Sequence, residues 1–235
     1  MRRFLQYRTS TLLAVVALSS FVLALHFNRV HRAQEQAKIR RTLMESECFQ
    51  FAWDWRYAAD FSPVDKPTYP RWAEEQLGED YLYSISAFDV QDNDNPESIL
   101  RTASKLKQIR RIRILNSDVS PSCCRAFQAF PKLQWLGLLL SPVDDAGMHE
   151  IGKLKNLAIL DIRNTQISDQ SIDDISSLPN LSWLNVHGSL ITEKGVEQLQ
   201  ERLPHCVVIN KPGGFSVWPT IPVEAGQVAV NQQGF

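Results

Sequence analysis

Acid–base chemistry is the first activity to consider, because His187 is predicted to stand beside Asp161 and Arg163 on neighbouring strands. A histidine oriented by a carboxylate can act as a general base. However, no serine or cysteine nucleophile falls on the neighbouring positions, and an open sheet face excludes water poorly. The sequence also lacks a glycine-rich phosphate loop and the common hydrolase motifs. We therefore interpret His187 as a surface side chain and expect no catalytic residue, no cofactor and no enzymatic activity.

Metal binding and disulfide formation are the chemistries that the cysteines could support. Cys48, Cys123, Cys124 and Cys206 form no CxxC motif and no cysteine–histidine cluster with the spacing of metal ligands. Adjacent Cys123 and Cys124 could pair only through a strained ring. We expect neither a metal site nor a disulfide scaffold. Instead, the repeat described next assigns Cys123, Cys124 and Cys206 to packed positions.

A 24-residue repeat is the feature that positions all of these residues. Repeats start at Leu82, Leu106, Phe130, Leu154 and Leu178, and a step longer by one residue reaches Leu203. We number positions by their distance from each start. Positions zero, three, six and eight are apolar, and position eleven is always small and polar: Asn93, Ser117, Ser141, Thr165 and Ser189. This pattern is the leucine-rich-repeat signature, and it predicts an α/β leucine-rich-repeat solenoid of about five repeats with a closing strand at 206–210.

Each repeat is expected to pair one short strand with one helix. Positions six and eight alternate with polar residues, as in a strand with one buried face, and position eleven can hydrogen-bond the turn that follows. Asn95-Pro96, Ser120-Pro121 and Thr192 supply predicted helix caps. Positions eighteen and twenty-one should face the core, as Leu100 and Ala103 do in the first repeat.

A binding surface is predicted on the concave strand face, which carries positions five, seven and nine. Trp135, Ile159 and Trp183 at position five should stand side by side, about 4.8 Å apart per strand. Aromatic residues and arginines are typical of protein-binding hot spots. The alternative is that position five is half-buried and only supports the sheet. The predicted contact residues are Arg111, Arg113, Trp135, Ile159, Asp161, Arg163, Trp183, Asn185 and His187.

The N-terminal segment predicts a membrane anchor. Residues 9–27 contain no acidic residue, lysine or arginine, and as a helix they would span roughly 28 Å, close to the bilayer's hydrocarbon thickness. A cleaved signal peptide is the alternative, but this run is longer and no clear cleavage site follows. Basic residues flank the span almost equally, so the positive-inside rule leaves the orientation open. We expect a single-pass protein of the cell membrane, with a basic N-terminus at 1–8.

The remaining segments are assigned by composition. Residues 28–47 are polar helix formers and predict a stalk. Alternating aromatic residues over 49–57 predict a strand, and a short helix is expected over 68–78, so that 48–81 cap the repeat domain at 82–210. The proline- and glycine-containing segment 211–235 is interpreted as a flexible tail that could pack in part through Val217 and Trp218.

Charge argues against nucleic acid as a partner. The net charge is −1, but residues 1–41 hold eight of the 25 basic residues and only one acid, Glu35. The rest of the chain is therefore strongly acidic. A nucleic-acid-binding protein would need a basic face on its folded part, whereas basic residues beside an apolar span suit a membrane surface.

The order of these features resembles the membrane-anchored leucine-rich-repeat proteins of planctomycete-type bacteria. Arg2-Arg3-Phe4, the span, the stalk and the aromatic strand are followed by Pro70, Trp72, Leu77, Gly78 and Asp80. The repeat variant, as in Ile167-Ser168-Asp169 and Ile191-Thr192-Glu193, is similar to the ribonuclease-inhibitor-like and F-box-associated class. The resemblance covers about residues 1–210. It implies an interaction module and transfers no catalytic residue.

Three functions remain open at this point. The first is a membrane-tethered module that binds a protein or peptide through the concave face. The second is a structural protein of an envelope assembly without a discrete ligand. The third is a substrate adaptor of a ubiquitin ligase, which would need an F-box helical segment, whereas residues 42–81 are short and strand-like.

Overall fold

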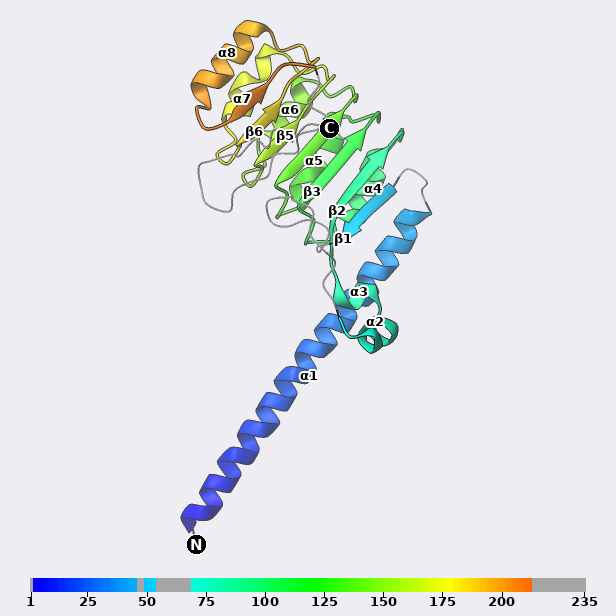
Figure 1. Cartoon of the computed structure of the whole chain (residues 1–235), viewed down its shortest axis with the longest axis vertical. Helices are drawn as coiled ribbons and strands as arrows, with labels where there is room; N and C mark the ends of the chain where they lie inside the picture. The colour runs from blue at the N-terminus through cyan, green and yellow to red at the C-terminus, as the bar shows by residue number, and fades with distance from the viewer. Residues whose placement is uncertain (1, 46–48, 54–68, 213–235) are drawn as a thin grey trace. The chain divides into compact units, whose positions relative to one another are not determined.

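The computed structural model describes residues 2–45, 49–53 and 69–212 (Figure 1). It divides into two compact units. The first unit comprises Met1–Lys38 and Tyr69–Leu82, and the second comprises Ile39–Thr68 and Tyr83–Phe235. Most of the segments predicted as a strand beyond Trp53 and as a flexible tail at 211–235 lie outside the described residues.

The first unit is built on one long helix, α1, which runs over Arg2–Met44 and includes the predicted span and stalk. From Thr11 to Asn28 its side chains are exposed, and buried or half-buried positions begin at Arg29. Its apolar part is long and hydrophobic enough to cross a membrane, a test that N-terminal signal sequences also pass. Exposure of so many large apolar side chains is costly in water.

Two short helices complete the first unit. Helix α2 spans Arg71–Leu77, within the predicted helix, and α3 spans Glu79–Leu82. Gly78 separates them with a φ of 74°, a conformation that glycine adopts without strain. The predicted cap at 48–81 is thus divided between the units, because residues 69–82 group with α1 and not with the repeats.

The second unit is an α/β fold on one seven-stranded sheet whose strands follow chain order. The first strand, β1 (Phe49–Trp53), runs antiparallel to β2 (Ile85–Gln91). All later neighbours are parallel: β3 (Arg111–Leu115), β4 (Trp135–Leu139), β5 (Ile159–Asp161), β6 (Trp183–Asn185) and β7 (Val207–Ile209). Parallel partners are 24 residues apart throughout, which confirms the predicted register of the first five repeats. The last step was predicted to be one residue longer, but β6 and β7 also pair at 24 residues. The closing strand is shorter than the predicted 206–210.

Helices follow the strands of every repeat. They are α4 (Pro96–Ala103), α5 (Pro121–Ala126) with the 3-10 turn η1 (Phe127–Ala129), α6 (Asp145–Ile151), η2 (Asp169–Ser171) leading into α7 (Ile172–Ser176), and α8 (Glu193–Arg202). Leu100, Cys124, Met148 and Ile175 are completely buried, as predicted for the core-facing helix positions. Phe49 of β1 extends this core by packing on Phe88 with a centroid distance of 5.4 Å.

The predicted helix caps are confirmed in two cases and wrong in one. Ser120 accepts a hydrogen bond from the backbone N–H of Cys123, and Thr192 accepts one from Gly195. Asn95 makes no side-chain cap, although Pro96 follows it as expected. Its backbone N–H instead donates to Asn93 Oδ1 at 2.7 Å, which ties Asn95 into the preceding turn.

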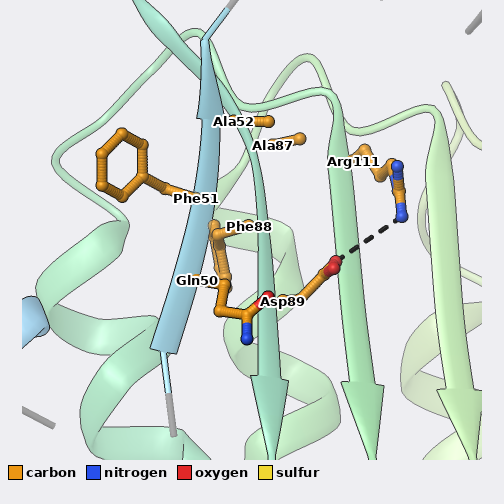
Figure 2. Close-up of a pocket in the computed structure, with 7 residues that line it drawn as sticks. All are labelled: Gln50, Phe51, Ala52, Ala87, Phe88, Asp89 and Arg111. Carbon is orange, nitrogen blue, oxygen red and sulfur yellow. Dashed lines mark ion pairs between the residues drawn. The ribbon is translucent and has the colours of Figure 1, made fainter. Parts of the chain in front are cut away.

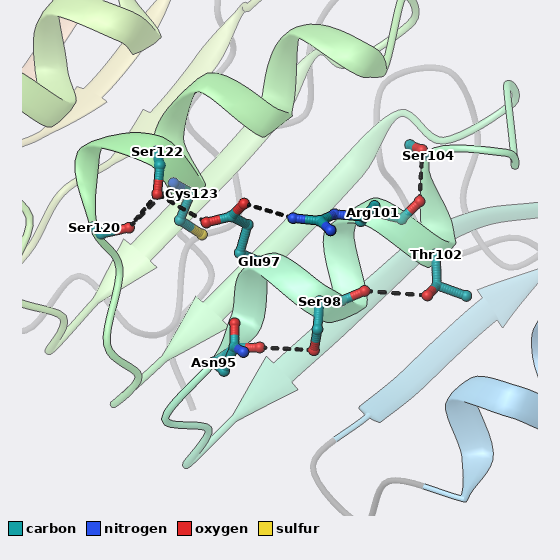
Figure 3. A network of polar contacts seen from close by, with 9 residues as sticks. All are labelled: Asn95, Glu97, Ser98, Arg101, Thr102, Ser104, Ser120, Ser122 and Cys123. Atoms are coloured by element: carbon teal, nitrogen blue, oxygen red, sulfur yellow. Dashed lines mark hydrogen bonds and ion pairs between the residues drawn. The ribbon is translucent and has the colours of Figure 1, made fainter.

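Polar side chains connect each repeat to the next. Ser117 Oγ accepts from the backbone N–H of Asn93 at 3.2 Å and donates to Leu115 O, which confirms the role predicted for position eleven. On the helix side, Ser122 Oγ of α5 donates to Glu97 of α4 at 2.8 Å, and Arg101 also contacts Glu97 (Figure 3). Because the repeats share these bonds, their stability depends on stacking.

A left-handed backbone residue ends each strand at position ten. Positive φ angles occur at Asp92, Asn116, Leu140 and Asn164, and at Gly188, all 24 residues apart. Aspartate, asparagine and glycine tolerate this conformation, whereas leucine does so at a cost of roughly 1–2 kcal/mol. Asn116 also donates to Asp92 across the repeats at 2.6 Å. Leu140 is therefore the unfavourable member of the series.

Candidate binding face

The candidate site lies on the face of the sheet predicted to be concave. We call this face, which carries positions five, seven and nine, the front face. Strand pairing places Trp135, Ile159 and Trp183 side by side, as predicted. They are nevertheless only 2%, 0% and 5% exposed, and Val207 and Ile209 of β7 pack against them. The expectation that these three side chains form an accessible patch is wrong.

Trp135 is buried because its ring lies along the sheet. A Cβ added at Gly137 would approach the Trp135 ring to 2.6 Å, so the indole occupies the space that a side chain would take. The Arg111 guanidinium lies over the same ring, 4.8 Å from its centroid. This geometry is a favourable cation–π contact. Glycine at position seven therefore allows tryptophan at position five to lie flat.

Asp161 and Arg163 form a buried ion pair beside this apolar row. Arg163 Nε lies 2.8 Å from one Asp161 oxygen, and its terminal nitrogen lies 2.6 Å from the other, a two-point contact. Their side chains are only 3% and 9% exposed. Such pairing satisfies two charges that burial would otherwise penalise. Asp161 and Arg163 thus engage each other. His187, predicted to be a surface side chain, is half-buried and takes no part in this ion pair.

Asn185 occupies the next strand, level with Asp161. Its side chain is completely buried, and its Oδ1 accepts from the backbone N–H of His187 at 3.1 Å. Its Nδ2 has no hydrogen-bond partner. A buried donor without an acceptor costs free energy, and this Nδ2 group is not accessible from the front face.

A more accessible, charged region lies on β2 and β3. Asp89 sits between two arginines: its Oδ2 is 2.6 Å from Arg113, and its Oδ1 is 3.6 Å from Arg111. The Arg113 and Asp89 side chains keep 30% and 24% of their surface exposed. Arg113 Nε is a buried donor without a partner. Arg111, Asp89 and Arg113 thus form one connected group of ion pairs, in which Asp89 and Arg113 are partly exposed.

A small pocket of about 60 Å³ lies beside these charges (Figure 2). Gln50 and Ala52 of β1 line it together with Ala87 and Asp89 of β2 and Arg111 of β3. Figure 2 shows the Asp89 carboxylate directed at Arg111. We call Asp89, Arg111, Arg113 and this pocket the charged half of the front face. The strands β4–β6, with Trp135, Ile159, Trp183 and Asn185, form the apolar half.

Asp89 is the front-face residue that the predicted site omitted. It occupies position seven of the first repeat, so the repeat register carried the signal for it. Leu140 is a second omission, since it lies 53% exposed at the end of β4. Position ten contains asparagine in the repeats before and after it, and this contrast marks Leu140 in the sequence.

The described cysteines are packed thiols. Burial raises the pKa of Cys123 to about 12, with nearby Glu97 and Asp118 contributing. Burial likewise raises the pKa of Cys124, and that of Cys206 to about 12. Cys123 and Cys124 are free and buried, whereas Cys206 is half-buried in the last repeat. Within residues 2–45, 49–53 and 69–212, no group of three histidine, cysteine or acidic side chains is placed to hold a metal.

This chain is similar to several solved structures. No family model and no curated protein matches the chain. An internalin from Listeria monocytogenes is 19% identical over 48% of this chain and 31% of its own, with a TM-score of 0.36. A leucine-rich-repeat protein from Leptospira interrogans is 20% identical over 46% and 33%, with a TM-score of 0.35. The chain spans about a third of both.

A third similar structure covers more of the chain. The leucine-rich-repeat ectodomain of a receptor kinase from Arabidopsis thaliana is 12% identical over 75% of this chain and 91% of its own, with a TM-score of 0.41. Similarities at this level say nothing about a ligand. The contacts described above are therefore the basis for any function.

Proposed function

We propose that this protein is a membrane-tethered leucine-rich-repeat solenoid that binds a protein or peptide through its front face, without catalysing a reaction. The charged half is the primary contact region. The observation that carries this proposal is the partly exposed Arg113 side chain, which shares the Asp89 carboxylate with Arg111 beside the pocket. A carboxylate or carbonyl oxygen of a partner would bind the exposed part of the Arg113 guanidinium through a charge-assisted hydrogen bond.

The buried residues of the apolar half have a supporting role in this proposal. Trp135, Ile159 and Trp183 hold the strands in register and fix Arg111 by stacking. A polypeptide lying across the strands can supply backbone carbonyl groups to the exposed arginine surface of this face, as peptides do in several recognition modes.

The exposed apolar part of α1 supports the proposed tether, because large apolar side chains are costly to expose to water. We propose a single-pass arrangement in the cell membrane, with the repeats on one side. Attachment at a membrane confines the front face near its partners and raises their effective concentration. The proposal does not depend on which side of the membrane the repeats occupy.

The test is quantitative co-purification from native membranes with the full chain. Arg113→Glu reverses the front-face charge and should abolish enrichment of a specific partner. Arg101→Glu is the matched control, because Arg101 is an exposed arginine on helix α4. Equal partner recovery by the wild type and both variants would contradict front-face recognition. It would favour a structural role in an envelope assembly instead.

A further inference from the structure

The first unit presents aromatic side chains next to the end of the apolar span. Trp72 of α2 is 59% exposed, and Tyr69 just before it is 38% exposed. Large aromatic side chains are normally buried or occupied by a partner. Tryptophan and tyrosine have one further preferred environment, the interface between a bilayer and water.

The contacts within this unit fix the level of the short helices along α1. Tyr81 of α3 hydrogen-bonds His26 Nδ1 at 2.8 Å, one residue before the predicted end of the span at Phe27. Arg29 binds the same helix end through its Nε, 3.0 Å from Tyr81 O, and its guanidinium lies 4.9 Å from the Tyr81 ring centroid. Gln36, about two helical turns after Arg29, donates a 3.2 Å hydrogen bond to Asp80. Helix α3 is therefore attached at the point where α1 changes from exposed apolar to partly buried polar residues.

The length of α2 and the depth of the membrane–water interface are similar, so α2 can reach that interface. A helix of seven residues is about 10 Å long, and the interfacial layer is roughly 5–8 Å deep on each side of the hydrocarbon. Gly78 joins α2 directly to α3, and Tyr81 of α3 bonds His26 at the end of the span. Trp72 is therefore held close to that end of the span.

We propose that α2 is an interfacial helix that inserts Trp72 into the headgroup region of the membrane crossed by α1. The inference rests on the proposed tether and goes beyond it by identifying a second lipid contact. Tyr81, His26 and Arg29 act as the clamp that sets its depth. Glu75 and Glu79 are exposed on the same helices, so attraction to anionic lipids does not drive the contact. A zwitterionic bilayer is the expected partner.

Lipid-borne quenchers of tryptophan fluorescence test this proposal. The full chain is reconstituted in phosphatidylcholine vesicles that carry bromine either near the headgroup end or near the methyl end of the acyl chains. The fluorescence difference between the wild type and Trp72→Phe isolates Trp72. We expect this difference signal to be quenched several-fold more by the shallow bromine than by the deep one. Trp183→Phe is the matched control, since Trp183 is buried in the second unit, and it should leave lipid quenching unchanged.

Loss of the clamp provides a second measurement. Tyr81→Phe keeps the ring that Arg29 covers but removes the hydroxyl bonded to His26, and it should lower the shallow quenching of Trp72. Two readouts separate this proposal from the tether. If brominated lipid does not quench Trp72 but the protein resists alkaline extraction, the proposed tether stands and the proposed insertion of α2 is wrong. If alkaline washing releases the protein from the vesicles, the tether and the interfacial helix are both wrong.

Discussion

The two halves of the front face differ in how their side chains are satisfied. In the charged half, Arg113 retains exposed surface beside Asp89. In the apolar half, Trp135, Ile159 and Trp183 pack on one another, and the adjacent Arg163 is engaged by Asp161. Position five is buried in both halves. Position seven differs, because Asp161 and Asn185 are buried whereas Asp89 and Arg113 are partly exposed.

The largest expected contrast comes from truncating one side chain in each half. Trp183→Ala removes a buried ring and should lower the free energy of unfolding by about 3–5 kcal/mol. Arg113→Ala breaks a partly exposed ion pair and should cost less than about 1 kcal/mol. Denaturant unfolding of the full chain in detergent measures both. Similar losses for the two variants would remove the distinction between the halves.

Gly137→Ala tests the flat position of the Trp135 ring. The new methyl group would meet the indole at 2.6 Å, so the ring must move, and we expect a loss of about 1–3 kcal/mol. In a Trp135→Ala background the same change should be nearly neutral, because the obstacle is absent. An equal cost in both backgrounds would show that the ring does not occupy this space.

Leu140→Asn tests the strained residue at the rim between the halves. Asparagine occupies this left-handed position in two neighbouring repeats, and we expect the change to stabilise the fold by about 0.5–1 kcal/mol. Leu190→Asn is the matched control, because Leu190 is 61% exposed and lacks a positive φ. Thermal unfolding compares them. Partner recovery with Leu140→Asn then shows whether the strained leucine is retained for binding.

The smallest expected effect concerns acid stability behind the apolar half. Burial raises the pKa of Asp145, but hydrogen bonds from Ser171 and Ser168 outweigh it and lower the pKa overall. A lowered pKa in the folded state contributes stability above the unfolded value of about 4, and this contribution disappears as the pH falls through the folded pKa. The free energy of unfolding should therefore decrease less between neutral and acidic pH in Asp145→Asn than in the wild type. Denaturant unfolding at a series of pH values measures this difference. A variant with the same pH dependence as the wild type would contradict this assignment.

Much of the second unit could be predicted from the sequence, because the 24-residue period determines both strand pairing and helix burial. Position eleven is an example: Ser117 was predicted to join adjacent repeats, and it does so. The left-handed position ten also has a sequence signal, in Asp92, Asn116, Asn164 and Gly188, but Leu140 interrupts that series.

The candidate site was harder to predict because exposure depends on neighbours across strands. Trp135 is buried owing to Gly137 two residues later, and Arg163 is engaged by Asp161 two residues earlier. The period identifies which residues share a face, but it does not indicate which of them pack against each other. The contacts of Tyr81 with α1 lie outside the repeats and have no periodic signal at all.

The most direct test of the central claim, recognition of a polypeptide by the charged half, is site-specific photo-crosslinking in native membranes. A photoreactive amino acid replaces either Gln91, an exposed front-face residue at the end of β2, or Arg101 on helix α4. The account predicts a discrete adduct from position 91 that disappears with Arg113→Glu, and none from position 101. Adducts from position 101 alone, or from position 91 regardless of Arg113, would contradict it.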